Sequence, residues 1–245
     1  MSLFLETVDT IGDGFGFSHF DSTHFMWLVA TVLILFANVI AFRNLKEKGR
    51  ALWKKIVAIL LVVDELFKMA ILFIGGNYSA GYLPLHLCSI NIFLIALHAW
   101  KPSKILDNFL YTVCIPGTLA ALLFPTWTSL PVLNAMHLHS FTVHILLLLY
   151  PAVLSICGDI KPDIRYLPKA LGLLVVMAIP IYIVNVLLDT NFMFLMYADE
   201  GNPLYLFQQM WGSHLLGFPV ITAGVLLVMY GPIIIYNAIK KKTTS

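Results

Sequence analysis

The feature that most constrains this chain is a series of seven long apolar stretches with few charged residues. They cover residues 25–42, 53–74, 82–99, 107–124, 134–157, 166–188 and 213–239. Each is long enough to cross about 30 Å of hydrocarbon as a helix, and a helix satisfies its backbone amides within the span. The pattern therefore predicts an all-α, polytopic membrane protein built as a bundle of seven transmembrane helices.

The composition excludes several classes of protein. Only 11% of the 245 residues are charged and 60% are hydrophobic, whereas soluble domains have about a quarter charged residues. Such a chain is neither an ordinary soluble enzyme nor a disordered protein. It contains no P-loop, no dinucleotide fingerprint and no basic aromatic patch, so we expect no nucleic-acid partner. Its three cysteines are too few and too scattered for a disulfide framework.

The basic residues predict the orientation in the membrane. All except Lys68 follow the first, third, fifth or seventh stretch: Arg43, Lys46, Lys48, Arg50, Lys54, Lys55, Lys101, Lys104, Lys161, Arg165, Lys169, Lys240, Lys241 and Lys242. By the positive-inside rule the C-terminus is cytoplasmic and the N-terminus is outside. We expect an extracellular segment at 1–24 with no cleavable signal peptide, a transmembrane domain at 25–239 and a basic tail at 240–245. In a bacterium the membrane would be the plasma membrane. The aromatic loop 189–212 is expected to lie at the interface or to re-enter the membrane.

The second stretch contains three ionisable residues, Asp64, Glu65 and Lys68. Each such group in hydrocarbon costs about 2.5–3.5 kcal/mol or more, so it needs a partner inside the bundle. Asp64 and Lys68 are four residues apart, in the order that favours an ion pair on one helix face. Two interpretations are open: a structural pair, or a pair that lines a polar cavity.

The third stretch places Cys88 among polar residues. Cys88 and Asn91 share a helix face, while His86 points away if the helix is regular, an inference that Pro84 weakens. A buried cysteine in a membrane protein is usually a small hydrophobic residue, which is our interpretation of Cys114 and Cys157. For Cys88 a nucleophilic role is the alternative.

Three histidines lie near the start of the fifth stretch. His137, Ser140 and His144 form one stripe of a helix, and His139 falls on the opposite side. Metal-binding histidine pairs on helices favour i, i+4 spacing, which is absent here, so a zinc site shared between several helices is the weaker interpretation. We expect no metal and no other cofactor. A histidine that faces a cysteine would suit a general base.

The remaining polar residues lie near the outer ends of the last two stretches. Tyr182, Asn185 and Asp189 share a stripe, Asn191 follows, and His214 begins the seventh stretch. Hydrogen bonding between helices is one explanation. The other is a cavity that opens to the outer leaflet, because the cytoplasmic halves contain few comparable groups.

Three motifs carry a resemblance to a known family. They are YLPLHLCS at 82–89, HSFTVHILLLLYP at 139–151, and VNVLLDTNFMFLM at 184–196 followed by Pro203. With them the chain resembles the YwaF / TMEM164 family of integral membrane proteins, over essentially its whole length by order of spans. The mammalian branch is described as a lipid acyltransferase, and a distant branch as membrane hydrolases of fatty-acid esters.

The resemblance implies a cysteine on the third span that takes an acyl group and a histidine on the fifth that acts as a base. In this chain these are Cys88 and His144. Asn191 matches the family's NY-type motif, in which Phe192 replaces the tyrosine. The position of the polar groups suggests further substrate-binding or oxyanion candidates: His86, Asn91, Asn185, Asn191, His137 and His214.

The sequence therefore predicts an acyltransferase that moves a fatty acyl chain between phospholipid and lysophospholipid partners through a Cys88 thioester. A lipid-ester hydrolase is an alternative. Another is a transporter or ligand-binding protein whose path is lined by Asp64, Lys68, Asn185 and His214, although no paired halves with broken helices are present. A third is a scaffold whose polar stripes only pack helices.

Overall fold

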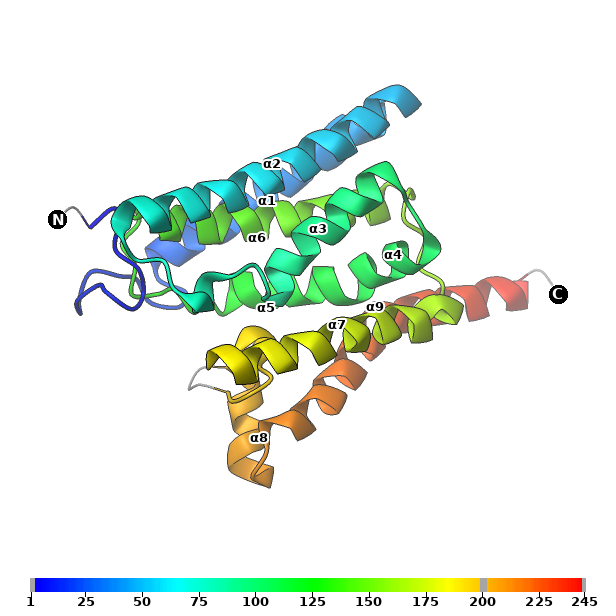
Figure 1. The fold of residues 1–245 in the computed structure, drawn as a ribbon. Coiled ribbons are helices and arrows are strands. Elements are labelled where there is room, and N and C mark those ends of the chain that lie inside the picture. The colour runs from blue at the N-terminus through cyan, green and yellow to red at the C-terminus, as the bar shows by residue number, and fades with distance from the viewer. Residues whose placement is uncertain (1–2, 199–201, 244–245) are drawn as a thin grey trace. The chain divides into compact units, whose positions relative to one another are not determined.

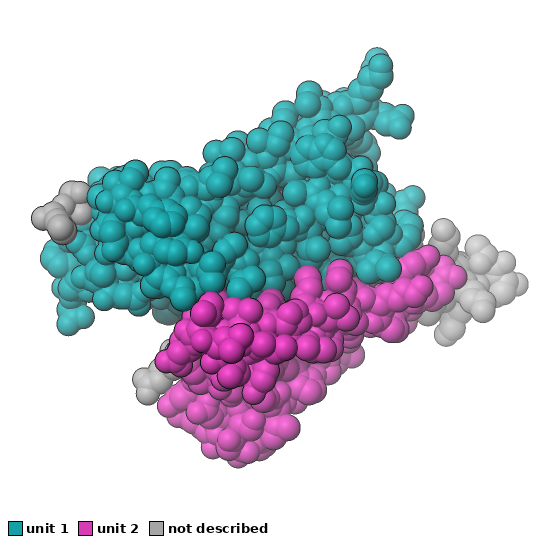
Figure 2. All heavy atoms as spheres, in the orientation of Figure 1, with its two compact units in different colours: residues 1–162 teal, residues 163–245 magenta. Residues whose placement is uncertain are grey.

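The structure is a computed structural model that describes residues 3–198 and 202–243, without the side chains of 236–238 and 240–243. The described residues form helices joined by turns, with no β-strand among them (Figure 1). The chain divides into two compact units, residues 1–162 and residues 163–245 (Figure 2). Of the predicted tail at 240–245, residues 240–243 continue a helix, and residues 244 and 245 lie outside the described residues.

The first unit contains six α-helices and two short helical turns. They are α1 (Ser22–Asn44), α2 (Glu47–Gly75), η1 (Ala80–Tyr82), α3 (Leu87–Trp100), α4 (Lys104–Phe109), the π-helical η2 (Leu110–Cys114), α5 (Ile115–Leu123) and α6 (Ala135–Ile156). The second unit contains η3 (Ile164–Tyr166), α7 (Leu167–Leu188), η4 (Phe192–Phe194), α8 (Pro203–Trp211), η5 (His214–Leu216) and α9 (Gly217–Thr243).

Within residues 3–198 and 202–243, six helical segments are long and apolar enough to cross a membrane. They are Ser22–Asn44, Ala80–Trp100, Lys104–Leu123, Ala135–Ile156, Ile164–Leu188 and His214–Ile235. The remaining predicted stretch, 53–74, lies within α2, whose 29 residues form one helix. Its apolar part contains Asp64, Glu65 and Lys68, so its composition alone does not mark it as a span. The structure confirms an all-α, multi-pass membrane protein, while the count of seven spans and the orientation stay predictions.

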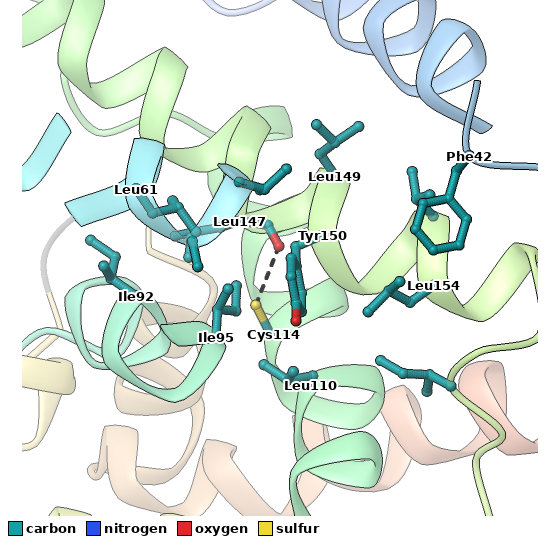
Figure 3. Packing of buried hydrophobic residues seen from close by; sticks show 14 of the residues in the cluster. Phe42, Leu61, Ile92, Ile95, Leu110, Cys114, Leu147, Leu149, Tyr150 and Leu154 are labelled. Atoms are coloured by element: carbon teal, nitrogen blue, oxygen red, sulfur yellow. Dashed lines mark hydrogen bonds between the residues drawn. The ribbon is translucent and has the colours of Figure 1, made fainter. Parts of the chain in front are cut away.

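Helix α6 is the central helix of the first unit. It contacts α1, α2, α3 and α5, and most of its side chains are buried. Figure 3 shows the apolar cluster around it, in which Leu61 of α2 and Ile95 of α3 pack near Leu147 and Tyr150. The thiol of Cys114 donates to the Leu147 carbonyl at 3.4 Å. A helix that is apolar on all sides must be surrounded by other helices or by lipid, and α6 is surrounded by helices.

The outer helices instead expose apolar side chains. On α1, Val32, Leu33 and Phe36 are each more than 60% exposed. In water such a surface would cause association, whereas in a bilayer it faces lipid tails that are equally apolar. These faces therefore fit contact with lipid.

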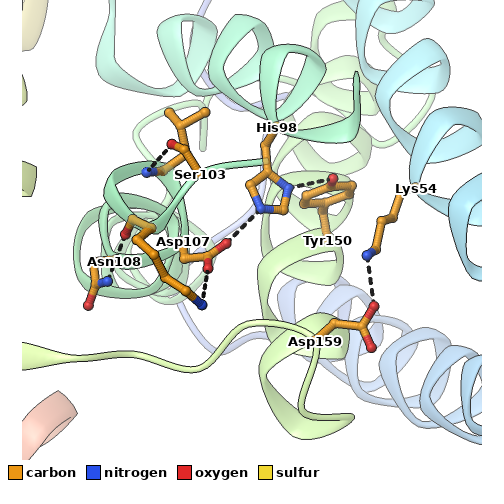
Figure 4. A network of polar contacts seen from close by, with 9 residues as sticks. Lys54, His98, Ser103, Asp107, Asn108, Tyr150 and Asp159 are labelled. Atoms are coloured by element: carbon orange, nitrogen blue, oxygen red, sulfur yellow. Dashed lines mark hydrogen bonds and ion pairs between the residues drawn. The ribbon is translucent and has the colours of Figure 1, made fainter. Parts of the chain in front are cut away.

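A buried polar network joins α3, α4 and α6 at the end of the unit where α3 finishes (Figure 4). His98 Nε2 lies 2.9 Å from Asp107 Oδ1, and His98 Nδ1 lies 2.9 Å from the Tyr150 hydroxyl oxygen. The carboxylate accepts, so Nε2 carries the proton and Nδ1 accepts from Tyr150. Lys104 donates to the other oxygen of Asp107 at 3.2 Å. The network connects three helices through groups that would be costly to bury alone.

The N-terminal segment is held against the start of α6. Asn134 caps that helix, since its Oδ1 accepts from the backbone amides of Met136 at 2.8 Å and His137 at 3.0 Å. Its Nδ2 donates to the carbonyls of Leu3 and Glu6. One side chain thus satisfies the helix end and fixes the segment that precedes α1.

The same segment also approaches the loop before α6 at Gly16. The Phe17 amide donates to the Thr128 carbonyl at 2.8 Å. A Cβ atom at Gly16 would lie 1.8 Å from that carbonyl oxygen. The two backbones can be this close only because Gly16 has no side chain.

We predict that Gly16→Ala lowers the free energy of unfolding by about 1–3 kcal/mol, because the backbone must move to relieve the clash. Thermal unfolding of the purified protein in detergent measures this. Gly12→Ala is the matched control, since its Cβ would make only an ordinary 3.7 Å contact with Phe15. Equal melting temperatures for the two variants would show that the close approach is absent.

We predict that Tyr150→Phe lowers the free energy of unfolding by about 1–3 kcal/mol, because it leaves His98 Nδ1 buried without a hydrogen-bond donor. The same unfolding assay applies. Tyr182→Phe, at a side chain that is 51% exposed, should leave the melting temperature unchanged. If Tyr150→Phe is also neutral, the hydrogen bond to His98 contributes no stability.

Candidate functional site

The charged residues of α2 pair differently from the sequence prediction. Lys68 pairs with Glu65, three residues before it, and both side chains are buried. The predicted ion pair between Asp64 and Lys68 is therefore wrong. Successive helix positions differ by about 100°, so Asp64 and Glu65 point in different directions. Spacings of three and four both permit a pair, and here the neighbouring helices decide between them.

Asp64 instead faces α6. Its Oδ1 lies 3.0 Å from the Thr142 hydroxyl, and its Oδ2 lies 3.0 Å from His139 Nδ1. The second contact is within ion-pair distance, but its geometry does not meet the criteria for a hydrogen bond. Neither atom has a hydrogen-bond partner in the described part of the chain. Asp64 and His139 thus form an aspartate–histidine pair between two helices.

Cys88 is the second residue of α3. Its side chain is half-buried and packs against the apolar cluster around α6. Cys88 lies in the first turn of α3, so its thiol is near the N-terminal end of that helix. Helix N-termini and nearby cations are settings in which reactive cysteines occur, whereas a thiol in purely apolar surroundings is inert.

His86 and Asn91 flank this cysteine. The first regular turn of α3 begins at Leu87, and His86 is its N-cap residue, so it lies before the helix rather than on a face of it. Asn91 lies one turn after Cys88 and is buried. Its Oδ1 has no hydrogen-bond partner within residues 3–198 and 202–243. An unpaired buried amide next to a candidate nucleophile is the kind of group a ligand can satisfy.

His144 is held in one orientation on α6. Its Nδ1 lies 2.6 Å from the Ser140 carbonyl oxygen, which can only accept, so Nδ1 carries the proton and Nε2 has the lone pair. Trp127 stacks on the ring at a centroid distance of 5.1 Å. Nε2 makes no hydrogen bond to any residue that the structure describes. His144 therefore presents a ring nitrogen whose lone pair no described residue uses.

His137 has no free nitrogen. Its Nδ1 donates to the Leu130 carbonyl at 3.1 Å, and its Nε2 accepts from the Trp27 indole at 3.0 Å. Both ring atoms are used by the protein, so His137 supports the fold at the start of α6. No ring nitrogen of His137 remains for the substrate-binding role expected from the sequence.

The other three candidates belong to the second unit. Asn185 Nδ2 donates to the Phe192 carbonyl at 3.0 Å, and its Oδ1 accepts from the Phe192 amide at 2.8 Å. Asn191 accepts from the Met196 amide at 3.1 Å. Both asparagines thus hold the turn after α7 instead of presenting free amides. His214 is buried, and its Nε2 has no partner among the described residues.

The sequence analysis missed the partners of Asp64. His139 and Thr142 are three residues apart and so share one face of α6. That spacing was the available signal, but it does not say which helix the face meets. The structure supplies this information, because α2 packs along α6.

The fold and these contacts define an integral, multi-pass membrane protein with buried polar side chains where α2, α3 and α6 pack together. The chain belongs to the TMEM164 family, whose family model matches residues 15–230. No curated protein and no solved structure gives a significant match.

We predict that Lys68→Met lowers the free energy of unfolding by about 3–5 kcal/mol, because Glu65 is left charged and buried. The double variant Glu65→Gln/Lys68→Met should recover most of the loss, as measured by thermal unfolding in detergent. Asp64→Asn/Lys68→Met is the matched control and should recover none. Rescue by the control in place of the first double variant would contradict the observed pairing.

Proposed function

We propose that the protein is a membrane acyltransferase that moves a fatty acyl chain from a phospholipid to a lysophospholipid through a thioester on Cys88. His144 is the base that activates the thiol. The observation that carries the proposal is the His144 ring, whose free Nε2 is set by the hydrogen bond to Ser140. It lies on α6, which packs against α3, the helix of Cys88.

The first step transfers the acyl group to the protein. The Cys88 sulfur attacks the ester carbonyl of the donor while His144 Nε2 takes the thiol proton. A carbon–sulfur bond forms, the carbon–oxygen bond breaks, and the leaving alkoxide receives the proton from His144. Asn91, one turn after Cys88, would donate from its Nδ2 to the carbonyl oxygen as negative charge develops on it.

The second step releases the acyl group. A lysophospholipid hydroxyl attacks the thioester, a carbon–oxygen bond forms and the carbon–sulfur bond breaks. The hydroxyl proton is removed by a base, and Cys88 recovers a proton to become a thiol. Water in place of the lysophospholipid would give a fatty acid, which is the hydrolase alternative. Apolar surroundings favour transfer because they exclude that water.

We also propose that α2 spans the membrane in addition to the six candidate spans, which gives seven spans in total, and that the C-terminus is cytoplasmic. The basic residues of the first unit support this, since Arg50 and Lys54 at the start of α2 both pair with Asp159, which follows α6. With this orientation Cys88, near the start of α3, would lie in the outer half of the bilayer. The substrate would then enter from the outer leaflet.

We predict that Cys88→Ala and His144→Ala abolish an acyl adduct that wild type forms when supplied with a labelled phospholipid. Intact-protein mass spectrometry measures the adduct, and hydroxylamine should remove it because thioesters are cleaved readily. Cys157→Ala is the matched control, another half-buried cysteine whose thiol lies 3.9 Å from the Val39 carbonyl. It should acylate as wild type does.

Two results would overturn the proposal. One is a lipid profile and acyl turnover that are the same for wild type and Cys88→Ala. The other is an adduct that persists in Cys88→Ala, because a different residue would then carry the acyl group.

A further inference from the structure

The end of the first unit where α2 begins and α3 finishes is strongly basic. Residues 43–55 contain six lysines and arginines and one carboxylate, that of Glu47. Two more lysines, Lys101 and Lys104, follow α3 directly. The positive-inside rule accounts for an excess of charge at one end of the protein, but not for where each side chain lies.

Some of these cations are matched by carboxylates of the same unit. Arg50 and Lys54 each lie 2.7 Å from an oxygen of Asp159. Lys104 lies 3.2 Å from Asp107, which is also bonded to His98. These ion pairs connect the ends of neighbouring helices, so their charge is used within the protein.

Lys55 and Lys101 differ from them, because neither forms an ion pair with a carboxylate that the structure describes. Lys55 Nζ instead lies over the ring of Trp100, 5.8 Å from its centroid. Trp100 is the last residue of α3 and Lys101 is the next residue. The contact therefore brings Lys55 to the point where Lys101 leaves the helix.

This contact leaves the lysine able to bind an anion. A cation over an aromatic ring keeps its charge, and an ammonium group has three hydrogen-bond donors. No described residue accepts a hydrogen bond from the side chain of Lys55 or Lys101. Trp100 is about half exposed, and tryptophan and lysine together at the end of a span are typical of the level of the lipid headgroups.

Both helices expose apolar side chains from this point towards the middle of the bundle. On α3, Leu97 and Phe93 precede Trp100 by one and two turns and share its stripe. On α2, Ile59 lies one turn after Lys55. All three apolar side chains are about half exposed. Since α2 and α3 pack together, they offer neighbouring apolar stripes, each with a lysine at the same end.

We propose that an anionic phospholipid binds this face of the protein, with its phosphate held by Lys55 and Lys101. One acyl chain lies along Leu97, Phe93 and Ile59. The charge of the two lysines selects an anionic headgroup, and the apolar stripes select a ligand with acyl chains. The inference needs only that the protein spans a membrane, and it is independent of the acyltransferase proposal.

The test measures lipid binding to the purified full-length protein in detergent by native mass spectrometry. Dioleoylphosphatidylglycerol is titrated against dioleoylphosphatidylcholine, which has the same acyl chains and no net charge. The variants are Lys55→Gln/Lys101→Gln and Lys55→Arg/Lys101→Arg. Lys46→Gln/Lys48→Gln is the matched control, since it removes the same charge from two exposed lysines at the same end of the unit.

We predict that wild type binds phosphatidylglycerol more tightly than phosphatidylcholine, and that Lys55→Gln/Lys101→Gln weakens phosphatidylglycerol binding about 30-fold. A lysine near anionic headgroups contributes about fivefold, so the loss of Lys101 alone should weaken it about fivefold. The arginine pair and the control should bind as wild type does. Unchanged phosphatidylcholine binding and an unchanged melting temperature show that the glutamine variants are folded.

Three results would overturn this inference. One is equal affinity of wild type for the two lipids. Another is equal weakening by the control, because the binding would then reflect the overall charge of this end and not Lys55 and Lys101. The third is displacement of phosphatidylglycerol by inorganic phosphate, which would show a site for free phosphate in place of a lipid. None of these results bears on acylation of Cys88.

Discussion

The arrangement of the first unit depends on the three ionisable residues of α2. A charge inside a bilayer protein must be matched by a partner, because neither lipid nor an apolar side chain can compensate it. Glu65 and Lys68 match each other, and among the described residues the partners of Asp64 are side chains of α6. The contact between α2 and α6 is therefore specific in rotation and in register, which packing of leucines alone would not determine.

Once that contact is fixed, the candidate site follows from it. Helix α3 contacts both α2 and α6, and the thiol near its start packs against the apolar cluster around α6. Cys88 is thus placed by interactions that its own sequence neighbours do not make. The same packing turns His139 towards α2 and leaves His144 beside Trp127.

The helices could be predicted from the sequence, whereas the partners of the polar side chains could not. Each predicted apolar stretch coincides with helical structure, because long runs of apolar residues have few other stable forms in a membrane. The predicted ion pair between Asp64 and Lys68 was wrong, because helix geometry permits an ion pair between Glu65 and Lys68 equally well. Asn185 could not be interpreted correctly, since its partner Phe192 is provided by a turn whose left-handed residues, Asp189 and Met193, carry no strong sequence signal.

The histidines show most clearly why composition could not separate structure from chemistry. His137, His139 and His144 are three imidazoles on one helix, and the residue type alone does not separate a structural role from a chemical one. What distinguishes them is the partner of each nitrogen: a carbonyl and an indole for His137, a single carbonyl for His144, and a carboxylate for His139. A histidine with both nitrogens bonded can only support the fold, whereas one with a single bonded nitrogen has a fixed tautomer and a free site for a proton. His144 meets this second condition, because the Ser140 carbonyl accepts from its Nδ1 and no described residue bonds its Nε2.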